Sequence, residues 1–346
     1  MTELEAEFRD HLRQALVEPS LEFAERPTPI TGGFDTRIFA FRLAGVPPAF
    51  AGPLILRLLD GHSDPSRVLR ERAIQNTLVE LGYPAPRVLL ASAETTPLGG
   101  AFLIMERLAG KPLPEVHFLG MGRVVAELQA RLHGLDAESF LENLARDGLV
   151  PRSFTFEGHL EQLADRVARR SLAGLARGID WLVKQCPRLD GRRVVCHGDF
   201  HPFNILMAAG TVTGVIDWPN AMVADPAFDV ATTLVILKLV PVDLFDLRAS
   251  LRWLATAARP LLVARYLRRY RRRRELDLGR LSYYEAAACM KALVRAGELR
   301  LSPRGASAPN PLFASDYRTV SSTASRESRE SRRYCRLHAR RCLTSV

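Results

Sequence analysis

One stretch of the chain, residues 194–229, carries the side chains best suited to chemistry: VVCHGDFHPFNILMAAGTVTGVIDWPNAMVADPAFD. It contains Asp199 in an H-G-D tripeptide, Asn204 five residues later, and Asp217 at the end of an apolar run. Phosphoryl transfer from a magnesium nucleotide needs a carboxylate beside the acceptor hydroxyl, and oxygen ligands that hold the cations on the phosphates. Asp199 therefore qualifies as the group beside the acceptor, and Asn204 and Asp217 qualify as ligands for Mg2+.

Each of these motifs also has an ordinary structural explanation. H-G-D is often a turn, and I-D-W is often the end of a strand. Their order in one short stretch, after a small sheet-and-helix segment, favours a shared site over a chance combination. Because Pro202 restricts the intervening loop, we expect Asp199 and Asn204 at the same edge of the fold.

The residues before about 110 predict a small lobe of mixed structure. Apolar residues at helical spacing predict a helix over 1–18, and Asp64-Pro65 predicts the start of a second helix that ends near Leu81. Alternating apolar residues predict strands within 30–43, at 54–59, from Arg87 and from Ala101.

The remainder of the chain is predicted to be mostly helical after a linker at 110–114. We expect helices at 120–134, 157–176, 177–186, 227–239, 242–273 with an interruption at Pro260, and 281–297. The short apolar runs VVCHGD, NILM and VTGVID predict strands and turns. The predicted domains are 1–109, 110–300, and a Ser/Arg-rich tail, 301–346, whose composition indicates disorder.

The segments HGDFHPFN, IDW and DPAFD resemble the aminoglycoside phosphotransferase and choline kinase family, over roughly residues 25–298. The resemblance implies an α+β, bilobal protein-kinase-like fold, with a small N-terminal antiparallel sheet plus helix and a larger, mainly helical C-terminal lobe. It implies Asp199 as catalytic base, and Asn204 and Asp217 as Mg2+ ligands. It also implies ATP or GTP as co-substrate, a small-molecule hydroxyl as acceptor, and a loop supported by His197, Asp225 and Asp229.

The N-terminal lobe offers candidates for contacts with the nucleotide. A turn at Gly32, Gly33 and Phe34 could present backbone N–H groups to phosphates, although a hairpin turn explains the same residues. Kinase-like folds place a Lys on the strand that here carries Arg57, paired to a helix Glu. No Lys precedes Lys111, so Arg57 is the candidate, with Glu71 as its partner. A surface pair of Glu71 with Arg67 or Arg70 is the alternative.

AFLIMERLAG resembles the family's connection between the lobes, where the adenine edge binds backbone groups. The resemblance implies Met105 as the bulky residue, with Glu106 and Leu108 giving backbone contacts. A core strand that ends in a turn is an alternative interpretation of the same residues. His133 is taken as a helix residue, and His201 lies inside the catalytic loop without a predicted role.

The positive charge of the chain is unevenly spread. The net charge is +10, of which residues 301–346 carry +6 and residues 218–300 carry +7, leaving −3 before them. This distribution argues against nucleic acid as a partner, although the run Arg271–Arg274 and the tail keep a nucleic-acid binder as an alternative. A positive substrate region also disfavours a polycationic aminoglycoside and favours a neutral or anionic alcohol.

Composition and cysteine usage narrow the remaining possibilities. Five cysteines without a C-x-x-C pair fit a reducing compartment, and the acidic start lacks the pattern of a signal peptide. The apolar run 230–240 is too short to span a bilayer. We therefore expect a cytoplasmic kinase for small molecules without a membrane partner. The alternative is a catalytically silent nucleotide-binding or scaffold protein of the same fold.

Overall fold

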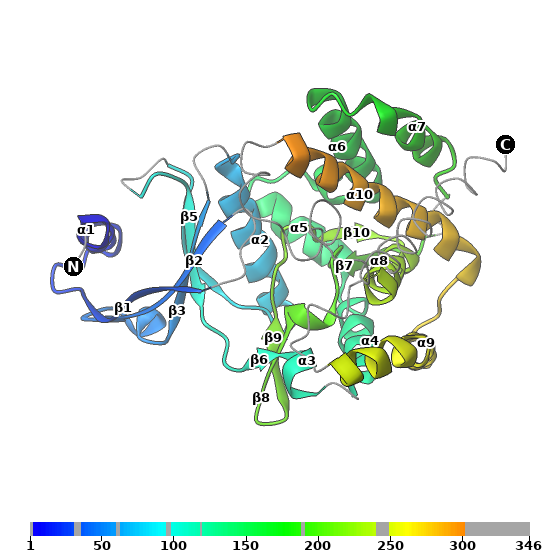
Figure 1. Ribbon diagram of the computed structural model, residues 1–346. Helices are drawn as coiled ribbons and strands as arrows, with labels where there is room; N and C mark the ends of the chain where they lie inside the picture. Colours follow the sequence, from blue (N-terminus) through cyan, green and yellow to red (C-terminus); the bar gives the residue numbers. More distant parts are fainter. Residues whose placement is uncertain are drawn as a thin grey trace. The chain divides into compact units, whose positions relative to one another are not determined.

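The computed structural model describes residues 3–30, 36–59, 63–94, 98–117, 120–187, 191–239 and 249–301 (Figure 1). These residues divide into two compact units. The first draws on residues 1–118, 142–149 and 202–219, and the second on 119–141, 150–201 and the residues from 220 onward. The predicted tail lies outside the described residues, and the predicted domain boundaries stay predictions.

A five-stranded antiparallel sheet forms the centre of the first unit, in the order β1-β2-β3-β5-β4. Its inner strands are apolar on the face that packs against helix α1 (Glu3–Leu16), where Phe8 and Leu12 meet Phe102 and Ile104. The strands are β1 (Glu22–Ile30), β2 (Thr36–Ala44), β3 (Leu54–Leu59), β4 (Val88–Ser92) and β5 (Phe102–Glu106).

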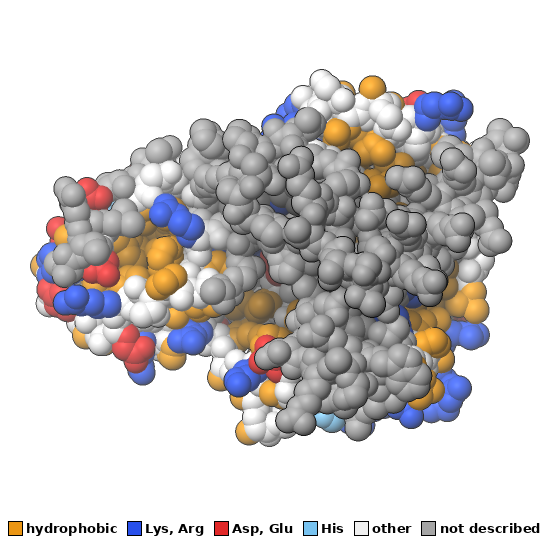
Figure 2. Space-filling view, in the orientation of Figure 1, with side chains coloured by type: hydrophobic (Ala, Val, Ile, Leu, Met, Phe, Trp, Pro, Cys, Tyr) orange, Lys and Arg blue, Asp and Glu red, His pale blue; other side chains and the backbone are white. Residues whose placement is uncertain are grey.

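Ion pairs fasten the exposed side of α1 to the start of β1. In the region of α1 and β1, basic and acidic side chains lie intermingled on the surface (Figure 2). Arg13 pairs with Glu22 and Asp10, and its Nε donates to the carbonyl of Leu21 at 3.0 Å. The charges here balance locally, as expected of a solvent-exposed helix face.

Helix α2 (Ser66–Glu80) lies against the sheet and begins close to where the sequence predicts. The Asp64 carboxylate accepts the backbone N–H of Ser66 at 2.9 Å, which satisfies one of the free donors of the first turn. The amide of Asn76 bonds both polar backbone groups of Val88, at 2.9 and 3.0 Å. These bonds fix α2 against β4, and with it every side chain that α2 presents to the sheet.

The first strand was not predicted, since the sequence gives it no apolar alternation. Strand β1 contains Pro27 and Pro29 and is mostly exposed. It pairs only with β2 and so forms an edge of the sheet. Proline removes a hydrogen-bond donor, and an edge strand tolerates this because one side of its backbone needs no partner strand.

A three-stranded sheet, in the order β6-β8-β9, completes the first unit. Its strands are β6 (Lys111–Pro112), β8 (Ile205–Ala208) and β9 (Thr211–Val215), and the short helix α3 (Leu113–Val116) follows β6. The β8–β9 hairpin corresponds to the predicted apolar runs NILM and VTGVID.

The second unit is mainly helical around one small sheet, in which β7 (Val194–Cys196) pairs with β10 (Met222–Ala224). Apolar residues from α6, α7, α8 and α10 form its core, which includes Phe156, Phe228 and Tyr284. The helices are α4 (Met121–Leu132), α6 (Phe156–Arg169), α7 (Ala176–Lys184), α8 (Pro226–Leu239), α9 (Ala249–Arg271) and α10 (Leu281–Leu301).

Two helical predictions need correction. Helix α5 (Ala137–Arg146) was not predicted, although Phe140 and Leu144 are fully buried at helical spacing. Helix α9 runs through Pro260, where an interruption was predicted. Proline removes one intrahelical hydrogen bond, and the Ala and Leu residues on both sides are strong helix formers that sustain the helix.

Over the described residues, no helix is both long and apolar enough to cross a membrane.

Phe102 is a test of the first unit's core because it is fully buried between the sheet and α1. Phe102→Ala is expected to lower the free energy of unfolding by about 3–5 kcal/mol, since it removes buried area and leaves a cavity. Val150→Ala is the control, because Val150 is 66% exposed with an ordinary extended backbone, and we expect it to change stability by less than about 0.5 kcal/mol. Urea denaturation measures both, and equal effects would contradict this description of the core.

Candidate active site

The β8–β9 hairpin brings Asn204 and Asp217 to the same end of one structure. Asn204 closes a short 3-10 turn (Pro202–Asn204) immediately before β8, and Asp217 follows β9. Ile205 pairs with Val215, and the N–H of Ile216 donates to the carbonyl of Asn204 at 2.9 Å. The two predicted metal ligands therefore flank the open end of the hairpin.

Asp217 and Asn204 differ in exposure. The Asp217 side chain is 42% exposed, whereas Asn204 is only 7% exposed. Asp217 has φ of +70°, a left-handed conformation that Asp adopts more readily than most residues. A carboxylate and an amide oxygen are the hard ligands that Mg2+ prefers, and it usually keeps several waters, so this donor set fits the ion.

Arg57 reaches two carboxylates from the middle of β3. Its Nη1 lies 2.6 Å from Oε1 of Glu71 on α2, and its Nη2 lies 3.4 Å from Oδ1 of Asp217. Gln75 also donates to Oε1 of Glu71, at 3.1 Å. The predicted pairing of Arg57 with Glu71 is present, and a contact between Arg57 and Asp217 accompanies it.

Burial and charge act in opposite directions on this pair. Burial raises the pKa of Glu71, and the neighbouring Arg57 opposes that shift. Burial lowers the pKa of Arg57, but the charges of Glu71 and Asp217 outweigh it and leave this pKa raised. The guanidinium therefore stays protonated, as arginine does throughout the ordinary pH range.

One donor of Arg57 remains unused. Its buried Nε–H has no hydrogen-bond partner among the described residues. Buried donors are usually paired, and leaving one unpaired costs about 1–3 kcal/mol. An oxygen of a phosphate would satisfy it, because phosphates accept the side-on pair of donors that a guanidinium offers. The residues present thus fit a nucleotide phosphate.

In the second unit, the residue before Asp199 is held at both of its polar groups. The N–H of Gly198 donates to Oδ1 of Asp229 at 2.7 Å, and Nζ of Lys291 on α10 donates to its carbonyl at 2.8 Å. Gly198 has φ of +73°, and a Cβ there would stand 2.5 Å from the carbonyl oxygen of Asn220. A side chain at this position would therefore clash with Asn220, and two hydrogen bonds hold the peptide that leads into Asp199.

Asp229 is the centre of a buried polar network. Its Oδ2 accepts from Gln129 at 2.9 Å and lies 3.1 Å from Nε2 of His133. The hydroxyl of Tyr270 lies 2.6 Å from Nδ1 of His133, and Tyr266 donates to Gln129. Burial alone would raise the pKa of Asp229, but the bonds from His133 and Gln129 leave it lowered from 3.8. The carboxylate is thus held ionised to receive Gly198.

Asp225 ties the same segment to α10. Its Oδ1 accepts the N–H of Ala227 in the first turn of α8, and its Oδ2 pairs with Arg280 at 2.6 Å, just before α10 begins. His197 is fully buried, with its ring edge-on to Phe200. Asp225 and Asp229 occupy positions that suit their predicted supporting role, which stays a prediction.

The remaining nucleotide candidates divide into two groups. Gly32, Gly33 and Phe34 lie outside the described residues. Glu106 ends β5, and its N–H donates to the carbonyl of Arg87 at 3.0 Å, which leaves that donor occupied within the sheet. Leu108 lies close to Gly214 of β9. Roles of Glu106 and Leu108 toward adenine stay predictions.

Comparison with known proteins decides the family. A family model described as the phosphotransferase enzyme family matches residues 27–284, which is most of the chain. The chain belongs to this family. The predicted resemblance is confirmed.

Two related proteins illustrate the range of the similarity. The chain is 27% identical over 174 residues to acyl-CoA dehydrogenase family member 11 of Pongo abelii, covering 47% of this chain and 22% of that protein. It is 31% identical over 215 residues to an aminoglycoside 3'-phosphotransferase of Streptomyces fradiae, covering 59% of this chain and 72% of that protein. The chain therefore spans only about a fifth of the first relative's length.

A solved structure confirms the fold. The chain is similar to a thermostable mutant of aminoglycoside phosphotransferase APH(4)-Ia in ternary complex with ADP and hygromycin B. The TM-score is 0.55 and the identity 18%, over 96% of this chain and 97% of that chain. The α+β, bilobal protein-kinase-like fold predicted from the sequence is thus correct.

Several residues that contact the segment from Gly198 to Asp229 were missed at the level of sequence. Lys291 and Gln129 were given no role, and His133 was assigned only to a helix. Tyr266 and Tyr270 were considered as part of an aromatic cage for choline or as core residues, and the structure buries both fully. These residues lie far along the chain from the motif they support, so no local spacing connects them. For Lys291 there was one signal: only four of the 48 basic residues are Lys.

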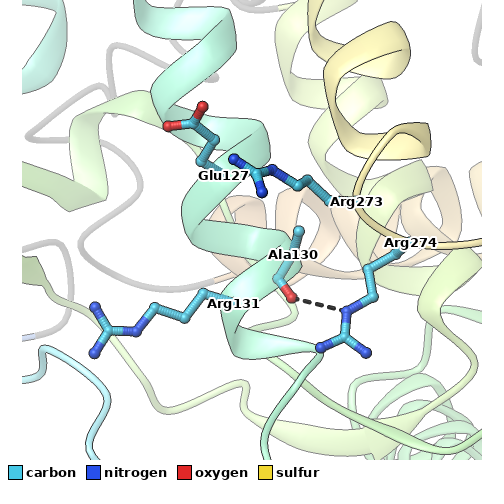
Figure 3. A pocket seen from close by; sticks show the side chains of 5 residues that line it. All are labelled: Glu127, Ala130, Arg131, Arg273 and Arg274. Atoms are coloured by element: carbon cyan, nitrogen blue, oxygen red, sulfur yellow. Dashed lines mark hydrogen bonds between the residues drawn. The ribbon is translucent and has the colours of Figure 1, made fainter.

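Figure 3 shows a pocket outside the catalytic segment, at the C-terminal turns of α4 and α9. It has a volume of about 330 Å³, and it is lined by Glu127, Ala130, Arg131, Arg273 and Arg274. Nε of Arg274 donates to the carbonyl of Ala130 at 3.2 Å, and Arg269 pairs with Glu127. Arg274 thus satisfies one of the last carbonyls of α4, a role that needs no ligand.

Gly198 can be tested against a matched glycine. Gly82 also has a positive φ, of +78°, but a Cβ there meets nothing within 4 Å. Gly82→Ala is expected to cost about 1–2 kcal/mol for the left-handed backbone alone. Gly198→Ala must also displace Asn220, so its loss of stability in urea denaturation should be clearly larger. Equal losses would contradict the steric argument.

The ionised state of Asp229 predicts a pH dependence of stability. Because its folded pKa lies below 3.8, ionised Asp229 stabilises the fold above that pH, and this stabilisation is lost as the pH falls through the folded value. Asp229→Asn should therefore lower the free energy of unfolding by about 1–3 kcal/mol at pH 7. The difference from wild type should narrow at pH 3, and a constant difference would contradict an ionised Asp229.

Proposed function

We propose that this phosphotransferase transfers the γ-phosphate of ATP or GTP to a hydroxyl of a small molecule, with Mg2+ as cofactor and Asp199 as catalytic base. One observation carries the proposal: Asn204 and Asp217 flank the end of one hairpin, and Arg57 contacts Asp217 with a donor left over for phosphate. Asp199 stands five residues before Asn204, on a loop whose preceding peptide is held from both sides.

The reaction forms a bond between the acceptor oxygen and the γ-phosphorus and breaks the bond from that phosphorus to the bridging oxygen. Asp199 would orient the acceptor hydroxyl and receive its proton. Asn204 and Asp217 would hold Mg2+, which supplies positive charge to the phosphate oxygens. Arg57 would donate to a phosphate oxygen through Nε. Because the transition state is loose, orientation and electrostatics would provide most of the acceleration.

The acceptor is proposed to be a neutral or anionic alcohol. Residues 218–300, the region expected to face the substrate, carry a net charge of +7, which opposes a polycationic substrate. The Streptomyces fradiae relative is an aminoglycoside 3'-phosphotransferase, so aminoglycosides belong in any acceptor panel. Glu275 and Asp277 are exposed acidic residues that could contribute a local acidic wall.

A catalytically silent nucleotide-binding protein is the second candidate function. It is favoured by one observation, the arginine at a position where kinase-like folds use lysine. The two candidates differ in turnover: the enzyme consumes nucleotide in the presence of Mg2+ and a suitable acceptor, whereas the silent protein binds nucleotide without consuming it. The proposed cytoplasmic location does not distinguish them.

Asp199→Asn tests the role of the base. With labelled nucleotide, Mg2+ and a panel of hydroxylated small molecules, wild type should phosphorylate at least one acceptor. The variant should lose about 10²- to 10⁴-fold in kcat, because it cannot accept the proton, and should keep its nucleotide affinity. Asp165→Asn is the control, since Asp165 is exposed and paired with Arg169.

Two results would contradict the proposal. If Asp199→Asn turns over like wild type, Asp199 is not the base. If wild type binds nucleotide but phosphorylates no acceptor and consumes no nucleotide with Mg2+, the silent alternative is correct.

A further inference from the structure

We infer that Arg57 competes with the metal ion for Asp217, so that this chain takes up a divalent cation tightly only together with nucleotide. The inference rests on the proposed function and adds to it the order in which the two ligands enter. Arg57 would then contact a phosphate of the nucleotide and would also determine whether the nucleotide binds with or without its metal ion.

The guanidinium of Arg57 already occupies the place of a cation beside Asp217. Nη2 lies 3.4 Å from Oδ1 of Asp217, while Nη1 is anchored 2.6 Å from Glu71. A metal ion that binds Oδ1 must displace a hydrogen-bonded positive charge, and a metal ion on either oxygen of Asp217 lies close to that charge. In a partly buried site, both effects lower the affinity for the free cation.

Asp217 is nevertheless reachable. Its side chain is 42% exposed, whereas Arg57 is 15% and Glu71 6% exposed. We therefore take the ion pair between Arg57 and Glu71, which is buried, as the contact that stays in place. The contact between Arg57 and Asp217 is the longer and more exposed of the two, and it is the one that a ligand can exchange.

A nucleotide would reverse the competition. The free Nε–H of Arg57 and the Nη2 that now faces Asp217 lie on the same edge of the guanidinium, which is the geometry that binds two oxygens of a phosphate. The bond to Asp217 would be exchanged for a bond to phosphate, and Asp217 would be left to the metal. Binding free energies are reciprocal, so the metal must in turn tighten nucleotide binding.

Lysine at this position would not couple the two sites in this way. An ammonium is a single point of positive charge, and the pair with the buried Glu71 would hold it away from Asp217. Arg57→Lys therefore keeps the charge that Glu71 needs and removes the branch that reaches Asp217. The variant therefore tests the competition for Asp217 without removing the positive charge that stabilises the buried Glu71.

The experiment measures binding of Mn2+ to the full chain, from the electron paramagnetic resonance signal of the free ion, without nucleotide and with ADP. Wild type should bind Mn2+ weakly alone and at least about 5-fold more tightly with ADP, within the usual range of coupling between sites. Arg57→Lys should bind Mn2+ alone about 5- to 10-fold more tightly than wild type, and ADP should add less. Asp217→Asn should weaken Mn2+ binding in both backgrounds.

Arg42→Lys is the matched control. Arg42 lies on β2 of the same sheet, 43% exposed and 3.7 Å from Glu25, so the same exchange there should leave Mn2+ binding unchanged. Thermal unfolding shows whether each variant is folded. If Arg57→Lys does not fold, the double variant Arg57→Gln/Glu71→Gln removes both charges of the buried pair together, and it should also bind free Mn2+ more tightly than wild type.

The outcomes separate the inference from the proposed function. If Arg57→Lys, or the double variant in its place, binds free Mn2+ no more tightly than wild type while Asp217→Asn weakens binding, the competition is disproved and the metal site stands. If wild type binds neither nucleotide nor Mn2+ with nucleotide, the proposed function itself fails, and the inference fails with it.

Discussion

The hydrogen bond from Gly198 to Asp229 is the constraint on which the loop that carries Asp199 depends. It connects the peptide before Asp199 to a carboxylate that is fully buried and therefore cannot move independently of α8. A buried charge of this kind persists only where other groups satisfy it, and Gln129 and His133 do so from α4 and its end. The loop consequently takes its position from helices far away in the chain.

Two different strategies handle charge in the two units. In the second unit, the ionised carboxylate of Asp229 is surrounded by hydrogen bonds from Gly198, Gln129 and His133. In the first unit, Arg57 shares one positive charge between Glu71 and Asp217 and keeps a donor in reserve. The first arrangement is suited to holding backbone still, and the second is suited to exchanging partners when an anion arrives.

How far the sequence predicts this structure depends on the range of the interactions. Strand β3 and helix α2 were predicted correctly because their apolar spacing and the Asp64 start signal are local. Asn204 and Asp217 were predicted to act together, and the hairpin between them brings them to one end. Lys291 lies 93 residues from Gly198, and Gln129 lies 100 residues from Asp229, so no local pattern reveals these contacts. Strand β1 was missed because it is stabilised by pairing with β2, and its own residues do not show the apolar alternation of a strand.

The choice between arginine and lysine has structural consequences in this chain. Arginine fills 44 of the 48 basic positions, so an arginine at position 57 follows the general usage. Its consequence is nevertheless local, because a guanidinium has an edge that bridges two acceptors and an ammonium does not. At position 291 the compact ammonium of lysine donates to the carbonyl of Gly198, a single acceptor that does not require the paired, planar donors of a guanidinium. The excess of arginine over lysine therefore matters only at positions where the neighbouring groups interact differently with a guanidinium and an ammonium.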